Sequence, residues 1–286
     1  MTNINYSKQS ALGYAGLALL RNWLIGKNAS IVSIFNEISS IVEKQPNILK
    51  VNEVKTKATE YDIKSGYKIW SKTYDTEENI LIQIEEPIVK RILKKYSRGK
   101  ALDLGCGTGR YSLYLDSLGH SVTGVDISKD MIRLAQKKSK KVQFIQGDIS
   151  NLSFEDNKFD LMVSGLAIHY VKNLEKAINE FARVLRPGGQ LIISSIHPWM
   201  VALGAHAEFH DKNSGWGFIK DNVLWHSSYI EAFNKSSFRI VQCYEPKIGS
   251  KEVKTLQKWS ELSLKTMSSA LKGLPVAIVW VLEKSK

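Results

Sequence analysis

The chain has few cysteines. It holds two in 286 residues, Cys106 and Cys243, and they lie far apart in the sequence. Two distant cysteines do not form the disulfide framework that holds small secreted domains together. With 43% hydrophobic and 24% charged residues, the composition is that of a globular protein and not of a disordered chain. The length suffices for one sizeable core.

The chain also lacks a long hydrophobic run. The longest, residues 11–20, ends at Arg21, whereas a membrane-spanning helix needs about 20 apolar residues. A secretory signal begins with a basic segment, and Lys8 alone is a poor one. We therefore expect a soluble, cytoplasmic protein with reduced thiols and no membrane partner.

Arginine is scarce although the chain is basic. The net charge is +12, but 32 of the 40 basic residues are lysines, spread along the sequence. Recognition of phosphates and bases favours the arginine fork. The densest basic run, residues 90–95, falls on a predicted helix and is interpreted as its solvated face. Nucleic acid is therefore not the expected partner.

From about residue 88, short apolar strands alternate with helices. The predicted strands span 101–104, 121–125, 142–145, 159–163, 191–193, 238–244 and 276–282. The predicted helices between them span 110–118, 129–139, 174–185, 226–235 and 251–270. This alternation predicts a doubly wound α/β fold with a mostly parallel seven-stranded sheet. The last two strands are expected to pair antiparallel, and Pro187-Gly188-Gly189 predicts a turn before the fifth strand.

Two segments lie outside this alternation. The pattern of residues 1–60 predicts helices and no strands. We interpret this segment as an N-terminal extension that forms a cap, a lid or a dimer surface. Residues 61–286 form the main domain, in which residues 197–225 are an insertion rich in tryptophan, histidine and glycine. A long insertion after a sheet strand is where loops build binding sites.

A glycine-rich loop follows the first strand of the alternation. Gly105, Gly107 and Gly109 separate that strand from a helix, which places backbone N–H groups and a helix N-terminus around a ligand. Asp126 comes 21 residues after Gly105, at the end of the next strand. An acidic residue at this place accepts the hydroxyls of a ribose. The spacing therefore predicts a ligand that contains adenosine.

The glycine spacing discriminates between ligands. The dinucleotide fingerprint Gly-x-Gly-x-x-Gly places its third glycine one position later than Gly109. Asp103 stands two residues before the first glycine, where its carboxylate would repel a pyrophosphate but suits a cationic ligand. The loop therefore fits a sulfonium amino acid better than a dinucleotide, which disfavours a nicotinamide dehydrogenase.

Five segments of the chain follow one another in an order and spacing that one enzyme family shares: residues 102–109, 122–128, 144–149, 159–164 and 183–189. Together they resemble the signatures of the class I S-adenosylmethionine-dependent methyltransferases. The resemblance covers about residues 65–196 and is closest to the branch that methylates small molecules. Tyr61-Asp62 and the run from Trp70 to Asp75 also resemble the family's usual lead-in to the cofactor site.

The resemblance implies S-adenosylmethionine as the cofactor and assigns residues to its methionine end. Gly105, Gly107 and Gly109 would let the loop approach the methionine and the ribose. Asp103 would hold the amino group through a water molecule, and Ser164 would line the methionine side. A structural alternative for Asp103 is a partner for the cap of the following helix.

For the nucleoside end, the resemblance implies that Asp126 binds the ribose hydroxyls and that Ile127 packs on the adenine. Asp148 would accept a hydrogen bond from the adenine amino group, and Ile149 would bind through its backbone. Tyr74 would close over the cofactor. The alternatives are an ordinary strand-end turn for Asp126 and an ordinary turn for Asp148.

Histidines follow two strands of the predicted sheet. His169 comes after the fourth strand and His197 directly after the fifth, and ligands of such sheets bind outside the carboxyl ends of the strands. We predict His197 and His169 as catalytic candidates, with His226 considered beside them. A base is needed only when the acceptor must lose a proton. The alternative for each is a hydrogen-bonded packing residue.

The insertion holds further aromatic and metal-binding residue types. Trp199, Trp216 and Trp225 are either a wall for a planar acceptor or part of a local core. His206 and His210 lack a third ligand nearby in the sequence, so no metal site is expected. We expect His197 and Trp199 to touch the acceptor and residues 1–60 to cover the opening.

The sequence thus predicts a methyltransferase that acts on a small-molecule acceptor. Two alternatives remain, an enzyme that modifies RNA and a protein of the same fold that binds the cofactor without turnover. An RNA enzyme would show a basic groove flanked by aromatic residues, and none is recognisable. The identity of the acceptor and the oligomeric state, a homodimer included, are left open.

Overall fold

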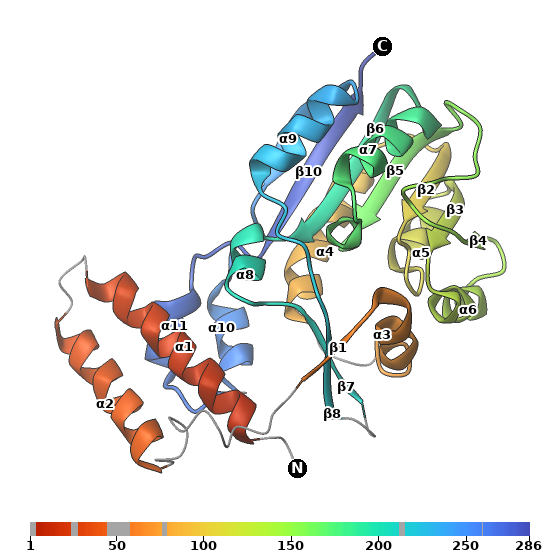
Figure 1. Ribbon diagram of the computed structural model, residues 1–286. Helices are drawn as coiled ribbons and strands as arrows, with labels where there is room; N and C mark the ends of the chain where they lie inside the picture. Colours follow the sequence, from red (N-terminus) through yellow and green to blue (C-terminus); the bar gives the residue numbers. More distant parts are fainter. Residues whose placement is uncertain (1–3, 24–27, 45–57, 76–78, 212–214, 259) are drawn as a thin grey trace. The chain divides into compact units, whose positions relative to one another are not determined.

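The computed structural model describes residues 4–23, 28–44, 58–75, 79–211, 215–258 and 260–286. Its contacts divide the chain into two compact units, and Figure 1 labels the helices and strands of both. The smaller unit combines Met1–Ala58 with Lys247–Pro275. The larger unit combines Thr59–Pro246 with Val276–Lys286.

A seven-stranded sheet forms the centre of the larger unit, in the order β4-β3-β2-β5-β6-β10-β9. Its strands are β2 (Lys100–Leu104), β3 (Ser121–Asp126), β4 (Gln143–Gln146), β5 (Phe159–Gly165), β6 (Leu185–Ile196), β9 (Phe238–Tyr244) and β10 (Ala277–Lys284). Strands β4, β3, β2, β5 and β6 are parallel, and β10 runs antiparallel to both of its neighbours, β6 and β9. This confirms the predicted doubly wound, mostly parallel α/β fold and the antiparallel pairing of the last two strands.

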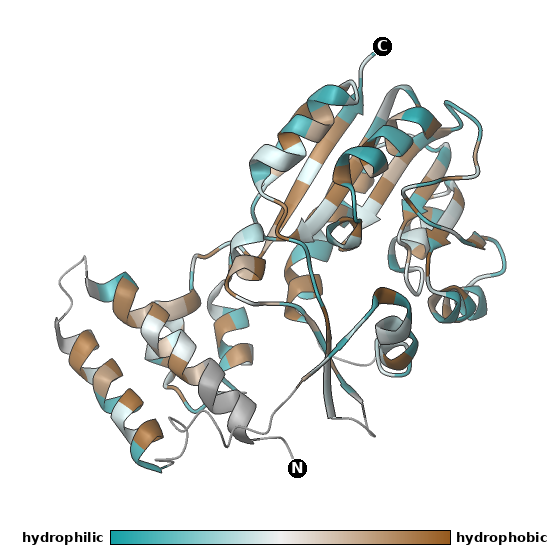
Figure 2. Ribbon diagram, viewed as in Figure 1, coloured by the Kyte–Doolittle hydropathy of each residue, from teal (hydrophilic) through white to brown (hydrophobic). Residues whose placement is uncertain are grey.

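Helices cover both faces of this sheet, and Figure 2 shows the hydrophobic character of its strands. Helices α7 (Leu174–Val184) and α9 (His226–Lys235) supply Phe181 and Phe233 to one core, which also holds Leu102. Helices α4 (Ile80–Leu93), α5 (Arg110–Ser117) and α6 (Lys129–Lys138) build the other core with Ala101. Successive strand residues point to opposite faces, which is why Ala101 and Leu102 belong to different cores.

Several helix starts follow from capping residues. The side chain of Ser128 accepts a hydrogen bond from the backbone N of Met131 and caps α6. Asn173 caps α7 in the same way. Helix α5 begins differently, because Gly109 stands at its N-cap with φ +90° and offers no side chain. Helix α5 thus begins without a side-chain cap.

The insertion is more regular than a loop. His197 caps the short helix α8 (Pro198–Ala202), and β7 (Ala207–Asp211) pairs antiparallel with β8 (Gly215–Ile219). Strand β1 (Thr59–Tyr61) adds to β8 in parallel, which makes a three-stranded sheet. Phe209 of this sheet is buried against Trp70 of α3 (Ile63–Trp70), so the insertion and the lead-in segment share one small core.

Two local predictions were wrong. Pro187-Gly188-Gly189 lies inside the bounds of β6 instead of forming a separate turn. The register shifts there: Phe159 pairs with Leu185 and Leu161 with Gln190, so the extra residues bulge out of the ladder. Residues 251–270 form two helices instead of one, α10 (Ser250–Gln257) and α11 (Leu264–Leu271), because Ser263 caps α11.

The smaller unit is helical. Helix α1 (Ile4–Trp23) packs against both α2 (Asn28–Lys44) and α11. Arg21 donates to the backbone oxygens of Ala270 and Lys272, at 2.7 and 3.0 Å, which anchors α1 beside the end of α11. Residues 24–27 and 45–57 of the predicted N-terminal extension lie outside the described residues. Within the described part of the chain, each helix is too short or too polar to cross a membrane.

Candidate functional site

The glycine loop joins β2 to α5 at the carboxyl end of the sheet. The backbone N atoms of Gly105 and Cys106 both donate to the carbonyl oxygen of Val125, at 2.8 and 2.9 Å. Gly105 and Gly107 have φ +69° and +52°, which favour glycine. A Cβ on Gly105 would lie 2.3 Å from that of Ala167, whereas one on Gly107 would meet no described atom within 4 Å. The loop is therefore packed below and open above Gly107.

Asp126 holds this loop from the end of β3. Its Oδ2 accepts a hydrogen bond from the backbone N of Gly107 and its Oδ1 from that of Ser128, both at 2.8 Å. Burial raises the pKa of Asp126, and the two backbone N–H groups oppose that shift. A carboxylate has about four acceptor positions, so the two that these bonds leave suit the two hydroxyls of a ribose.

Asp103 and Ser164 lie at the carboxyl ends of β2 and β5. Asp103 is 1% exposed, and its Oδ2 accepts a hydrogen bond of 2.7 Å from the hydroxyl of Ser112 in α5. Burial raises the pKa of Asp103 to about 6. The Ser164 hydroxyl is fully buried and has no hydrogen-bond partner among the described residues. A cationic ligand with polar groups would satisfy both side chains.

The turn after β4 lies beside the end of β3, because the backbone N of Gly147 donates to the carbonyl oxygen of Asp126 at 2.9 Å. Asp148 in this turn is exposed, and its Oδ1 accepts from the backbone N of Ser150 at 2.8 Å. This bond is that of a turn-forming aspartate. Ile149 is buried, and Ile127 after β3 is half-buried. Their predicted contacts with an adenine stay predictions.

Tyr74 belongs to an aromatic cluster with Tyr67, Trp70 and Tyr170. The Tyr74 ring lies 4.9 Å from that of Trp70, and the Tyr67 hydroxyl bonds that of Tyr170 at 3.3 Å. Burial raises the pKa of Tyr74, so its phenol stays neutral. The next residue, Asp75, accepts a hydrogen bond of 2.7 Å from the Thr108 hydroxyl. This bond holds the Tyr74 segment against the glycine loop.

His169 is buried, and both of its ring nitrogens have partners. Nδ1 lies 3.1 Å from the Ser195 hydroxyl, and Nε2 lies 3.1 Å from Oδ1 of Asp221, which is also buried. The carbonyl oxygen of His169 accepts from the side-chain amide of Asn222 at 2.9 Å. His169 thus ties the end of the insertion to β6. Its role as a base stays a prediction, and this arrangement is that of a histidine held by hydrogen bonds.

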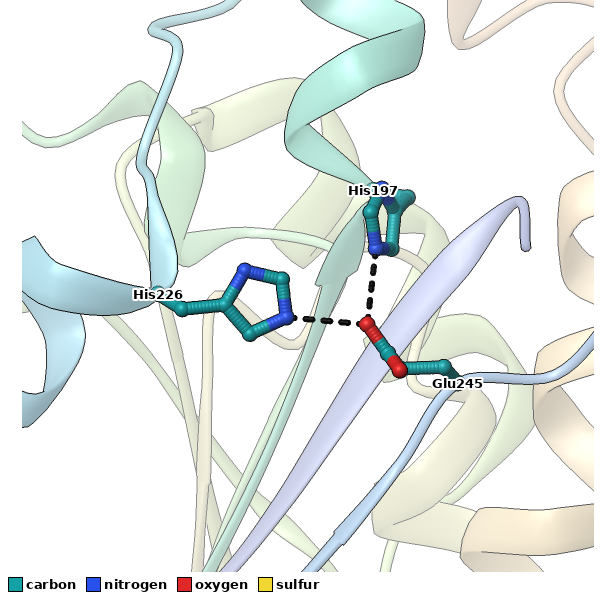
Figure 3. A group of neighbouring side chains, drawn as sticks. All are labelled: His197, His226 and Glu245. Carbon is teal, nitrogen blue, oxygen red and sulfur yellow. Dashed lines mark hydrogen bonds and ion pairs between the residues drawn. The ribbon is translucent and has the colours of Figure 1, made fainter. Parts of the chain in front are cut away.

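His197 belongs to a cluster that Figure 3 shows with His226 and Glu245. Nε2 of His197 lies 3.0 Å and Nε2 of His226 2.9 Å from the same oxygen, Oε1 of Glu245. The other nitrogen of His197, Nδ1, accepts a long bond of 3.4 Å from the backbone N of Trp199. Burial lowers the pKa of His197, and the hydrogen bond from His197 lowers that of Glu245. At neutral pH the cluster therefore joins the neutral imidazole of His197 to the carboxylate of Glu245.

The tryptophans of the insertion belong to three separate elements. Trp199 of α8 lies 6.5 Å from the His197 ring, and Trp216 of β8 packs edge-on against His210. Trp225 precedes α9 and is 49% exposed. Their contact with an acceptor stays a prediction.

The sequence analysis missed two acidic residues. Glu245 follows β9 directly, and an acidic residue at the end of a predicted strand was the available signal. Glu85 is fully buried in α4 and accepts hydrogen bonds from Arg110 at 2.9 Å, from the Tyr111 hydroxyl at 2.7 Å and from the Ser194 hydroxyl. Glu85 therefore fixes the first turn of α5, directly after the glycine loop.

Residues 102–193 match a family model described as a methyltransferase domain. The chain is 34% identical over 146 residues to the demethylmenaquinone methyltransferase of Staphylococcus saprophyticus, which covers 48% of this chain and 63% of that protein. It is 33% identical over 105 residues to the malonyl-[acyl-carrier protein] O-methyltransferase of Pectobacterium atrosepticum, with 37% and 42% covered. The chain thus spans between about four-tenths and two-thirds of the length of these relatives.

Solved structures share the fold. The crystal structure of an S-adenosylmethionine dependent methyltransferase from Mesorhizobium loti matches with a TM-score of 0.54 and 20% identity. The match covers 70% of this chain and 98% of that one, and at this identity it speaks for the fold. The five motifs, the strand order and the matched domain agree with one another. Residues 102–193 therefore match a methyltransferase domain, and the larger unit shares the fold of a solved S-adenosylmethionine dependent methyltransferase.

Proposed function

We propose that this protein transfers a methyl group from S-adenosylmethionine to a small-molecule acceptor. The observation that carries the proposal is the joint geometry of Gly107 and Asp126. The loop is open above Gly107, and the Asp126 carboxylate has acceptor positions left beside it. The Ser164 hydroxyl is buried and has no hydrogen-bond partner in the described part of the chain, so it offers a further polar group at the same edge. These features fit the ribose and methionine parts of the cofactor.

When bound, the cofactor supplies a methyl group on a sulfonium, whose leaving group is neutral. The protein then has to bind, align and shield the reactants, and alignment alone contributes about 7–11 kcal/mol to such reactions. Asp126 and the glycine loop hold the nucleoside end, and Asp103 faces the cationic end. Tyr74 and its aromatic neighbours exclude water next to the loop.

We place the acceptor at the carboxyl ends of β5 and β6, next to His197 and Trp199. His197 follows β6 directly, and ligands of open α/β sheets bind outside such strand ends. The names of the two relatives describe methylation of a quinone precursor and of an acyl group on a carrier protein. Both point to a small acceptor group, so quinols and carboxylic acids come first among the candidates.

The test is a methyl-release assay that follows S-adenosylhomocysteine by mass spectrometry. The panel contains phenols and quinols, carboxylic acids, amines and a short RNA, each incubated with the full-length protein. We expect acceptor-dependent product with a member of the small-molecule groups and none in a Gly107→Val variant. Product with the RNA alone would favour the RNA-modifying alternative. Binding of the cofactor without any product would favour the non-catalytic alternative.

A further inference from the structure

Three elements of the larger unit bring His197, His226 and Glu245 together. His197 follows β6, Glu245 follows β9 and His226 is the first residue of α9. Because β6 and β9 both run antiparallel to β10, their carboxyl ends lie at the same edge of the sheet. This is also the edge that carries the glycine loop, so the cluster lies where ligands of this type of sheet bind.

The side chains of the cluster point toward one another (Figure 3). Each offers one donor atom, and the three donor atoms all lie within 4.8 Å of one another. We propose that His197, His226 and Glu245 bind a divalent transition-metal ion of the Zn²⁺ class. The site is distinct from the cofactor loop, and the proposal does not depend on the methyl-transfer activity.

The distances are close to those of a metal site. Zn²⁺ binds imidazole nitrogen and carboxylate oxygen at about 2.0–2.2 Å, which places the donor atoms of a tetrahedral site about 3.3 Å apart. The two separations to Oε1 of Glu245 are 3.0 Å for His197 and 2.9 Å for His226. Only the separation between the two imidazole nitrogens has to shrink. That separation is at most 4.8 Å, and the His226 side chain, which is 38% exposed, has solvent beside it into which its ring can turn.

The chemistry of the donors supports the same ion. Two imidazoles and one carboxylate suit Zn²⁺ and its neighbours, whereas Mg²⁺ and Ca²⁺ prefer sites made of oxygen. A metal ion binds the neutral form of each imidazole and the ionised form of the carboxylate. Coordination through Nε2 places the proton of the His197 ring on Nδ1. Protonated Nδ1 no longer accepts the hydrogen bond from the backbone N of Trp199, which at 3.4 Å is already long.

Three protein ligands leave a fourth position open, as in catalytic zinc sites. At the sheet edge this position is able to take an oxygen atom of a small molecule. The prediction that the chain has no metal site rested on His206 and His210, which lie outside this cluster. In the structure, Nδ1 of His206 accepts a hydrogen bond from the backbone N of Asp221, and the His210 ring packs against Trp216.

The experiment titrates the full-length, chelator-treated protein with ZnCl₂ in a calorimeter, without cofactor or acceptor. A parallel titration with CoCl₂ follows the visible absorption of four-coordinate Co²⁺. We expect one site per chain in the wild type. Glu245→Gln and His226→Asn are each expected to weaken Zn²⁺ binding at least about 100-fold, more than the loss of an outer-shell partner. His210→Asn removes an exposed imidazole outside the cluster and is the matched control with unchanged affinity.

Circular dichroism and thermal melting of each variant establish that it is folded. Two results would overturn the proposal: no Zn²⁺ binding by the wild type up to millimolar concentration, or equal binding by the wild type and by folded Glu245→Gln and His226→Asn. Either would leave the cluster as a hydrogen-bonded group. Because cofactor binding is measured separately with S-adenosylhomocysteine, failure of the metal site is distinguishable from failure of the proposed function.

Discussion

The Asp126 carboxylate has two tasks, and its replacement separates them. It accepts hydrogen bonds from the backbone N atoms of Gly107 and Ser128. In the complex it would also accept the two ribose hydroxyls. Asp126→Ala removes the acceptor for both pairs, whereas Asp126→Asn keeps one oxygen and loses the charge.

The magnitude follows from these contacts. Loss of a charged acceptor for two hydroxyls costs about 1.5–3 kcal/mol of binding free energy. At about 1.4 kcal/mol per factor of ten, this is a 10- to 150-fold rise of the dissociation constant for Asp126→Ala. Asp126→Asn is expected to lie between this variant and the wild type. The free energy of unfolding of Asp126→Ala should also fall by about 1–3 kcal/mol, because two backbone N–H groups lose their partner.

Isothermal calorimetry with S-adenosylhomocysteine measures the affinities, and urea unfolding measures the stabilities. The wild type is expected to bind in the micromolar range. Asp130→Asn is the matched control, since Asp130 pairs with the exposed Arg133 at the surface of α6. Unchanged affinity in a folded Asp126→Ala variant would refute the ribose assignment. Loss of stability without loss of affinity would leave Asp126 as a turn residue.

Three further predictions concern the same edge of the sheet. Burial raises the pKa of Asp103 from 3.8 to about 6. Between these pH values the folded protein keeps a proton on Asp103 that the unfolded chain releases. The free energy of unfolding that this proton contributes is therefore lost as the pH rises from about 4 to 6. Asp103→Asn should therefore exceed the wild type in unfolding free energy at pH 8, by up to about 3 kcal/mol, and not at pH 4; a pH-independent difference in urea melts would contradict this. Gly107→Val should abolish cofactor binding in calorimetry, because its side chain would fill the open space and strain a backbone at φ +52°; retained affinity would place the ligand elsewhere. His197→Ala should lower turnover about 10²–10⁴-fold if the ring is a base, and far less if it only positions the acceptor. In both cases the affinity for the cofactor should stay unchanged. A loss of cofactor affinity as large as the loss of turnover would contradict the assignment of His197 to the acceptor site.

Local sequence patterns were sufficient to predict the central strands of the fold. The strands around the glycine loop are short apolar runs next to strong turn residues, so β2, β3 and β5 lie within two residues of their predicted bounds. The start of β6 could not be predicted from the sequence, because Pro187-Gly188-Gly189 has the composition of a turn. Only pairing with β5 shows that this segment is a bulge within a strand.

The missed parts depend on contacts between distant residues. Strand β1 pairs with β8, and the paired residues Thr59 and Gly217 are 158 positions apart, so no local pattern marks that partner. The role of Glu245 depends on the end of β9, which brings its side chain within hydrogen-bond distance of His197 and His226. Conversely, the hydrogen bond from Ser112 to Asp103 supports the structural alternative that the sequence had offered for that aspartate, beside its predicted role toward the cofactor.

Hydrogen–deuterium exchange with and without saturating S-adenosylhomocysteine shows where on the chain the ligand lies. If the cofactor binds at the glycine loop, exchange slows in peptides that span residues 103–110 and 126–129, at the carboxyl ends of β2 and β3. A nicotinamide dinucleotide should give no such protection. Unchanged exchange in these peptides at saturating ligand, or protection confined to other segments, would show that the cofactor does not bind there.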